Sequence, residues 1–124
     1  MYSIRTEFEF EAAHSLKLDY ESPCQNLHGH SYRCAVTLKG TKLDKNGMII
    51  DFKTLKKIIK ETIEDKLDHK NLNDIFEVNA TAEYMSEWIG NQINKKLIED
   101  SINATCIKVE LNETSKNKAI WEID

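Results

Sequence analysis

Hydrophobic and polar residues alternate one by one in four parts of the chain. In residues 2–13, Tyr2, Ile4, Phe8 and Phe10 alternate with polar and charged side chains, and residues 32–39 repeat the pattern. Two further alternating runs, centred on Val109 and Trp121, are separated by a short SKNK turn. A period of two residues is typical of a strand with one buried face. We therefore expect four strands, of which the last two form a hairpin.

The middle of the chain instead follows the period of a helix. Leu55, Ile58, Ile59 and Ile63 recur at helical spacing after Asp51, a residue type favoured as an N-cap. The segment LDHKNLND, residues 67–74, breaks this pattern. A second helix is predicted from the NATAE segment, with Asn79 or Thr81 as its cap, through Met85, Trp88, Ile89, Ile93 and Leu97.

The order of these elements defines the expected fold class. Two strands, two helices and two strands predict an α+β fold: a four-stranded antiparallel sheet with two helices on one face, in the order ββααββ. The 124 residues, 40% of them hydrophobic, suit one domain spanning residues 1–124. The exposed edges of such a sheet favour assembly with further copies of the chain.

Charge and composition narrow the function. A net charge of −4 argues against binding to nucleic acid or to a membrane surface, because both need a broad basic field. The N-terminal segment lacks the pattern of a secretory signal, and no apolar run is long enough to span a membrane, so we expect a cytoplasmic protein. Three cysteines without a CxxC motif argue against a disulfide framework.

The segment CQNLHGHSY, residues 24–32, contains a candidate metal site. His28 and His30 are two residues apart on an extended segment, so their side chains point the same way, and His14 ends the neighbouring strand. Three imidazoles can hold Zn²⁺ and leave a fourth position for water or substrate, as catalytic zinc sites do. The alternative is that two surface histidines simply flank Gly29.

The three cysteines occupy different contexts. Cys34 lies on an apolar strand face and is expected in the core, and Cys106, predicted on the face opposite Ile107, is expected to be inert. Cys24 lies in a polar loop, where its thiol could act as a base or nucleophile. It could also be a fourth ligand of a closed, structural zinc site.

Two further polar groups are candidates for chemistry. His69 follows Asp68 outside the helical pattern, and an Asp–His pair can move protons, although an exposed loop is the commoner explanation for two such residues. Glu113 continues the apolar face of the strand through Val109 and Leu111, where an unpaired carboxylate is costly. Its partner is either a structural cation or a ligand that presents two N–H groups.

Six segments in this order, together covering nearly the whole chain, resemble one family. They are FEAAHSL, CQNLHGHSY, IIDFKTLKK, LDHKNLND, NATAE and LNET. The chain is similar in these segments to the 6-pyruvoyltetrahydropterin and 6-carboxytetrahydropterin synthases. The resemblance implies a T-fold subunit whose sheets join in threes into a barrel, two such rings forming a hexamer with active sites between subunits. It also implies the following roles: zinc binding by His14, His28 and His30, a catalytic base at Cys24, a proton relay at Asp68 and His69, and pterin binding by Glu113.

The family resemblance also implies a reaction. The substrate would be 7,8-dihydroneopterin triphosphate, and the short CxxxHGH spacing resembles the 6-carboxytetrahydropterin synthases, which release acetaldehyde and triphosphate and supply the 7-deazaguanine pathway to queuosine. Ala80 departs from the family pattern, in which proline is common at this place, and this should cost local rigidity only.

Three other functions stay open at this stage. The chain could be a 6-pyruvoyltetrahydropterin synthase, a non-catalytic subunit that binds zinc and pterin, or a structural zinc module closed by Cys24. The last would unfold when its metal is removed.

Overall fold

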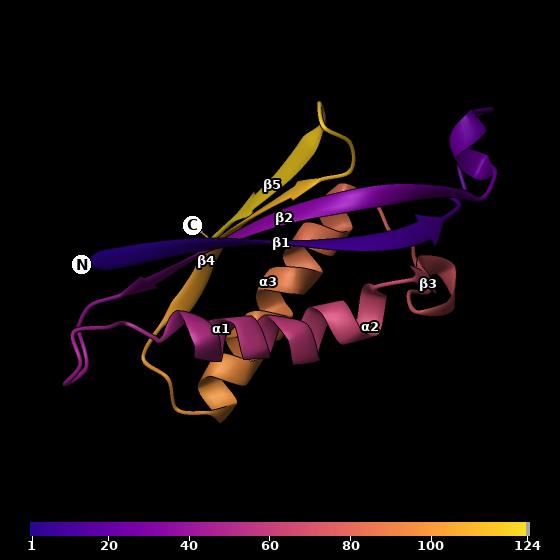
Figure 1. Ribbon diagram of the computed structural model, residues 1–124. Coiled ribbons are helices and arrows are strands. Elements are labelled where there is room, and N and C mark those ends of the chain that lie inside the picture. The colour runs from indigo at the N-terminus through magenta and orange to yellow at the C-terminus, as the bar shows by residue number, and fades with distance from the viewer. Residues whose placement is uncertain (124) are drawn as a thin grey trace.

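The computed structural model describes residues 1–123 and confirms the predicted α+β class. The strands are β1 (Tyr2–His14), β2 (His28–Gly40), β3 (Lys70–Asn71), β4 (Thr105–Asn112) and β5 (Lys118–Glu122). The helices are α1 (Phe52–Ile59), its π-helical continuation η2 (Lys60–Glu64), α2 (Asp65–Leu67) and α3 (Ala82–Glu99), with short 3-10 turns η1 (Pro23–Gln25) and η3 (Leu72–Asp74). Both long helices lie on the same side of the sheet (Figure 1).

The sheet has five strands in the order β3-β1-β2-β4-β5, one more than the four predicted. β1 and β2 pair antiparallel along their whole length, from Tyr2 opposite Gly40 to His14 opposite His28. The additional strand, β3, pairs in parallel with Ala12 and Ala13 at the end of β1. Two residues are too few to produce a periodic pattern, so sequence alone did not reveal this strand.

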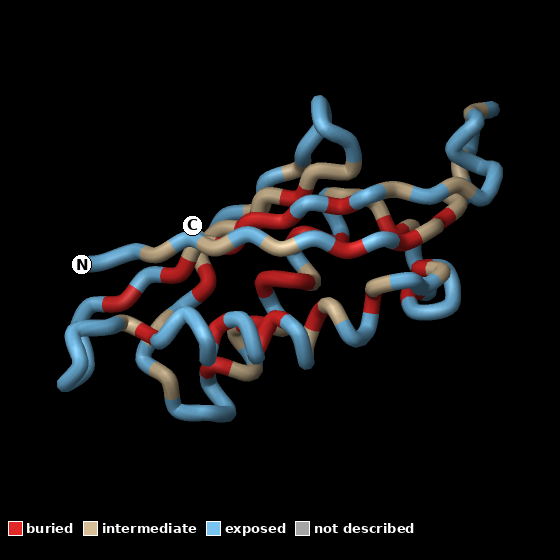
Figure 2. Tube along the Cα trace, viewed as in Figure 1, coloured by how far each residue is buried: buried red, intermediate tan, exposed pale blue. Residues whose placement is uncertain are grey.

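The core lies between the sheet and the helices, where buried and exposed residues alternate along β1 and β2 (Figure 2). It is built from the even-numbered residues of these strands and the apolar stripes of α1 and α3. The opposite face of the sheet, here called the open face, carries charged residues that pair across strands, such as Arg33 with Glu9 at 3.3 Å. Over residues 1–123, no helix combines the length and apolar character needed to cross a membrane.

A register shift in β4 corrects one prediction. Val36 pairs with Val109, but Leu38 pairs with Cys106, so Ile107 is skipped. Cys106 is consequently buried on the core side, and Ile107 is only partly buried. The expectation that Ile107 shares the core face and Cys106 faces away was wrong, because a bulge reverses the alternation locally.

The helix caps follow the sequence signals. The Asp51 side chain accepts a hydrogen bond from the Lys53 N–H, and Thr81 accepts one from the Tyr84 N–H. Thr81 is therefore the N-cap of α3, and the other candidate, Asn79, is left free for a different contact.

Candidate metal and catalytic site

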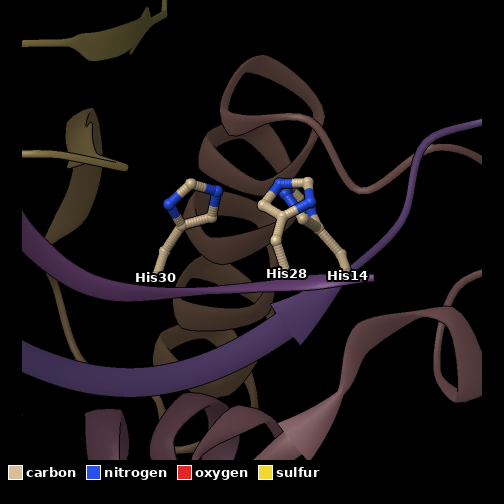
Figure 3. A group of neighbouring side chains, drawn as sticks. All are labelled: His14, His28 and His30. Carbon is tan, nitrogen blue, oxygen red and sulfur yellow. The ribbon is translucent and has the colours of Figure 1, made fainter. Parts of the chain in front are cut away.

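Three histidines meet at the end of the β1–β2 pair. His14 lies opposite His28, and His30 lies opposite Ala12, so the pairing register puts all three rings on the core side of the sheet. Each offers one nitrogen, and these nitrogens all lie within 4.8 Å of one another. Figure 3 shows the rings rising from the same side of the two strands, in front of α3. The predicted cluster is thus assembled by local strand geometry.

Backbone carbonyls orient two of the rings. The Nδ1 atom of His14 lies 2.9 Å from the Ala80 carbonyl oxygen, and Nδ1 of His28 lies 2.7 Å from that of Asn26. A carbonyl oxygen can only accept, so each Nδ1 is assigned the proton and Nε2 keeps its lone pair. This is the outer-shell arrangement that histidine ligands of metals normally have.

The remaining nitrogens fit a metal ion. The Nε2 atoms of His14 and His30 are buried and have no hydrogen-bond partner among the described residues. Burial lowers the pKa of both imidazoles, which favours the neutral form that binds metals. Buried, unsatisfied and neutral nitrogens that converge on one point can hold a metal ion.

Tyr32 lies next to the cluster in the core. Its ring centroid is 5.4 Å from that of His30 and stacks on Phe10 at 4.8 Å. The hydroxyl group is buried and has no hydrogen-bond partner within residues 1–123, and burial raises the pKa of Tyr32, so the phenol stays neutral. Sequence analysis assigned Tyr32 to the strand only.

Cys24 lies in η1, the turn that joins β1 to β2. Its backbone N–H donates to the Ser22 hydroxyl, its carbonyl accepts the Leu16 N–H at 2.9 Å, and its side chain is exposed and free. The three-histidine cluster does not include it. Cys34 and Cys106 are both buried, so Cys24 has the accessible thiol of the chain.

Asp68 and His69 contact each other, which adjacent residues often cannot do. The Asp68 Oδ1 atom lies 2.9 Å from Nδ1 of His69 and also accepts the Glu11 N–H at 2.8 Å. This backbone hydrogen bond is the main reason that the pKa of Asp68 is lowered. His69 has a φ of 61°, uncommon for a residue with a side chain, and its N–H donates to the Glu11 carbonyl.

Among the described residues, the three-histidine cluster does not include Asp68 or His69. His69 lines a hollow of about 600 Å³ with Glu11, Gly29 and Ser31, whose side chains or α-carbons face the open side of the sheet; Ala12 and His30 also border it. The three histidines point to the core side of the same strands. In one chain, the three histidine rings therefore lie on the core side of the strands, whereas His69 lies at the hollow of the open side.

Glu113 follows β4 and approaches the histidine cluster. Its Oε1 atom lies 3.6 Å from Nε2 of His30, and its side chain is 30% exposed. It lines a hollow of about 360 Å³ together with Lys118 and the first turn of α3, Thr81–Glu83. A carboxylate placed beside open space can accept hydrogen bonds from a ligand with paired N–H groups.

Sequence reasoning missed three groups around the site. The Ala80 carbonyl that orients His14 has no side-chain signal. Asn73 and Asn79 each bind the backbone that follows His14. Asn73 had been noted only within the motif LDHKNLND, and Asn79 only as a candidate helix cap in NATAE.

The fold and its histidine cluster define the chain as an α+β protein of the T-fold type, and comparisons with known proteins agree. The family model for 6-pyruvoyl tetrahydropterin synthase matches residues 3–123. The chain belongs to this family of enzymes.

Individual relatives carry names from both branches of the family. The 6-carboxy-5,6,7,8-tetrahydropterin synthase of Synechocystis is 38% identical, with 72% of each chain covered. The 6-pyruvoyl tetrahydrobiopterin synthase of Dictyostelium discoideum is 36% identical over 79% of this chain and 72% of its own. The structure of 6-pyruvoyl tetrahydropterin synthase from Caenorhabditis elegans superposes with a TM-score of 0.81, at 27% identity, over 99% of this chain and 96% of that one.

Proposed function

We propose that this protein, as a single domain spanning residues 1–124, is a zinc-dependent 6-carboxy-5,6,7,8-tetrahydropterin synthase. It converts 7,8-dihydroneopterin triphosphate to 6-carboxy-5,6,7,8-tetrahydropterin and releases acetaldehyde and triphosphate. The observation that carries the proposal is the cluster of three convergent imidazoles with the Glu113 carboxylate 3.6 Å away. Such a site can bind a metal through nitrogen and a pterin through a carboxylate at the same time.

His14, His28 and His30 would hold the zinc. When bound, zinc supplies Lewis acidity to the side-chain hydroxyls of the substrate. The exposed thiol of Cys24, as thiolate, removes the hydrogen from the neighbouring carbon. Glu113 accepts hydrogen bonds from the ring N–H and amino groups of the pterin, which explains a carboxylate that continues an apolar strand.

Asp68 and His69 would transfer protons on the other side of the substrate. Their contact of 2.9 Å supports this role, because the carboxylate fixes the orientation of the imidazole. His69 lines the hollow of the open face, so we infer that the pair serves the site of another copy of the chain. This favours a homo-oligomer, a ring of three or two stacked rings, with active sites between subunits.

A 6-pyruvoyltetrahydropterin synthase is the second candidate. The Dictyostelium discoideum relative with that name favours it, at 36% identity. The short segment of three residues between Cys24 and His28 favours the 6-carboxy branch. In that branch the product would enter the 7-deazaguanine pathway to queuosine. This pathway, like the cytoplasmic location, stays a prediction.

The test is to incubate the zinc-loaded protein with 7,8-dihydroneopterin triphosphate and to identify the products by mass spectrometry. We expect 6-carboxytetrahydropterin and acetaldehyde. The Cys24→Ala variant should lose at least about 100-fold in kcat, since general-base catalysis typically contributes this much or more. Cys106→Ala removes a buried thiol away from the site and is the matched control.

Each other outcome has a defined meaning. A 6-pyruvoyl product would transfer the protein to the second candidate function. Full activity of Cys24→Ala would contradict the role of the thiol. Absence of turnover together with tight pterin binding would leave a non-catalytic binding subunit. Unfolding on removal of zinc would favour a structural metal site.

A further inference from the structure

Two asparagines bind the backbone that follows His14 in the same unusual way. The Asn73 side chain accepts the Ser15 N–H at 2.7 Å and donates to the Ser15 carbonyl at 2.9 Å. The Asn79 side chain accepts the Lys17 N–H at 2.9 Å and donates to the Lys17 carbonyl at 2.9 Å. Each carboxamide therefore satisfies both polar groups of one residue, as a neighbouring strand would.

These contacts continue the hydrogen-bonding pattern of a paired strand beyond the end of β1. In extended backbone, the N–H and C=O of one residue point to the same side, and those of the next residue point to the other side. Ser15 and Lys17 thus face the two asparagines, and the Leu16 N–H faces the Cys24 carbonyl, to which it donates at 2.9 Å. The segment is held from both sides although no strand pairs with it.

The segment Ser15–Lys17, which these hydrogen bonds hold in place, connects the candidate site residues. It begins directly after His14, whose Nδ1 lies 2.9 Å from the carbonyl of Ala80, the residue next to Asn79. It also holds the Cys24 turn through Leu16, and the Gln25 side chain of that turn donates to the Leu18 carbonyl at 3.3 Å. Asn73 follows β3, which begins immediately after His69. The two amides therefore join the ends of the segments that carry metal ligand, thiol and relay.

We infer that Asn73 and Asn79 are positioning residues of the metal and thiol site, which fix His14 and the Cys24 turn relative to each other through the backbone of Ser15–Lys17. The inference rests on the proposed function for its catalytic meaning. Its physical content, a site held in shape by two amides, is independent of which reaction occurs. Without the side-chain amides of Asn73 and Asn79, the proposed metal ligand His14 would lie at a fraying strand end.

The chain provides a matched control for this inference. Asn94 makes the same pair of contacts to Cys106, donating to its carbonyl at 2.9 Å and accepting its N–H at 2.7 Å. Cys106 pairs with Leu38, ten residues along β2 from His28. Asn94→Ala therefore removes the same two hydrogen bonds at a place remote from the site.

The first readout is zinc affinity, measured with Zn²⁺ alone by competition with a chromogenic chelator. We expect Asn73→Ala and Asn79→Ala each to weaken binding about tenfold, the lower end of the effect of outer-shell groups on metal sites. Asn94→Ala should bind Zn²⁺ as the unchanged protein does. Asn73→Asp and Asn79→Asp keep the oxygen that accepts the backbone N–H but cannot donate to the carbonyl, so they should also weaken binding, and they replace the alanine variants where those do not fold.

The second readout is the rate at which the zinc-free protein reacts with the thiol reagent DTNB. Cys34 and Cys106 are buried, so the native reaction reports on Cys24. The rate should change by at least about threefold in Asn73→Ala and Asn79→Ala, because the turn that carries the thiol is no longer held in one conformation, and should not change in Asn94→Ala. Equal effects in all three variants, or none in the two site variants, would overturn the inference.

Hydrogen exchange tests the same point without any substitution. In the unchanged protein, the amides of Ser15, Leu16 and Lys17 should exchange at least about 100-fold more slowly than those of an exposed turn, because each is hydrogen bonded. Exchange as fast as at an exposed turn would contradict the inference. None of the three readouts uses a pterin, so a lack of synthase activity would disprove the proposed function and leave this inference to be decided separately.

Discussion

At the scale of single residues, the three thiols show that burial decides what a cysteine can do. Cys24 is exposed in a turn, whereas Cys34 and Cys106 are 0% exposed. Burial raises the pKa of the Cys34 thiol, and it raises that of Cys106 from the ordinary 9.0 to about 12. The two core thiols are therefore protonated and inert under conditions in which an exposed thiol reacts.

This difference predicts an alkaline instability. Above about pH 9, the unfolded chain loses thiol protons that the folded chain keeps, so unfolding is favoured as pH rises. The stabilisation is complete below the unfolded pKa and is lost toward the folded one. Each buried thiol should lower the free energy of unfolding by about 1.4 kcal/mol per pH unit in this window. Urea denaturation of the zinc-free protein between pH 8 and about pH 10 measures it.

Substitutions identify the groups responsible for the slope of the free energy of unfolding against pH. The double variant Cys34→Ala, Cys106→Ala should have a clearly shallower dependence on pH, whatever its stability at pH 8. Cys24→Ala is the control and should keep the slope of the unchanged protein, because its thiol is exposed in both states. A slope unaffected by the double substitution would mean that other groups titrate on unfolding.

Residue types explain why some of the site could be predicted. Histidine spacing predicted the cluster, because HxH on a strand and a histidine at the end of the paired strand must converge. The contribution of Asn73 and Asn79 could not be predicted, because amide hydrogen bonds to backbone depend on where a distant loop lies. The same holds for the Ala80 carbonyl, which leaves no trace in residue type.

At the scale of elements, the contact between α3 and β5 depends on a residue without a side chain. A Cβ atom built at Gly90 of α3 would lie 2.7 Å from Cε3 of Trp121 on β5, and closer still to Cζ3. Gly90 is buried, so the indole packs directly on the helix backbone. Glycine is thus required here by close approach, although it is a poor helix former.

Gly90→Ala should consequently destabilise the protein. In an exposed helix this change would stabilise by up to about 1 kcal/mol. Here the overlap with Trp121 should outweigh that gain and cost about 1–3 kcal/mol, the usual range for overpacking. Chemical denaturation gives the free energy. Tryptophan fluorescence in a Trp88→Phe background, in which Trp121 is the remaining tryptophan, reports whether this indole moves into water.

The neighbouring position provides the control for this change. Asn91 is exposed on α3, and Asn91→Ala should change the free energy of unfolding by no more than about 0.5 kcal/mol. If Gly90→Ala proved stabilising, the close packing of the indole on α3 would be contradicted.

Long periodic elements were predictable and short irregular ones were not. The strands through Phe10 and Tyr32 and both helices produce many repeats of one period, which makes their type clear. The strand β3 has two residues, and the bulge beside Leu38 places Cys106 instead of Ile107 on the core side of β4. Both depend on pairing partners far away in the chain, and neither changes the average hydrophobicity of its segment.

At the scale of the whole molecule, the two faces of the sheet carry different parts of the proposed chemistry. The histidine cluster faces the helices, and His69, which contacts Asp68, lines the open-face hollow with Ser31. The β1 edge is paired only at Ala12 and Ala13 in the part of the chain that the structure describes, and β5 forms the other edge. Unpaired edges at both ends of one sheet suit head-to-tail pairing between copies, which closes into a ring.

This arrangement predicts that two inactive variants restore each other. Cys24→Ala keeps the relay, and His69→Ala keeps the thiol, so each alone should be inactive. Mixed in equal amounts and allowed to reassemble, they should recover about a quarter of wild-type activity if one chain supplies the thiol and a neighbour supplies the relay. Product formation, measured as in the test of the proposed function, gives the recovery.

The fraction of activity that is recovered distinguishes a site shared between chains from a site within one chain. A site that takes thiol and relay from different chains is intact only when one variant occupies one position and the other variant occupies the next, each with a chance of about one half. A site built within one chain would recover nothing, since every chain in the mixture lacks one group. A mixture of Cys24→Ala with Cys24→Ala, His69→Ala is the control and must stay inactive, because no chain in it has the thiol. Recovery near a quarter would therefore make assembly a condition of catalysis, and would explain why this chain places Asp68 and His69 on the face that its own metal ligands do not share.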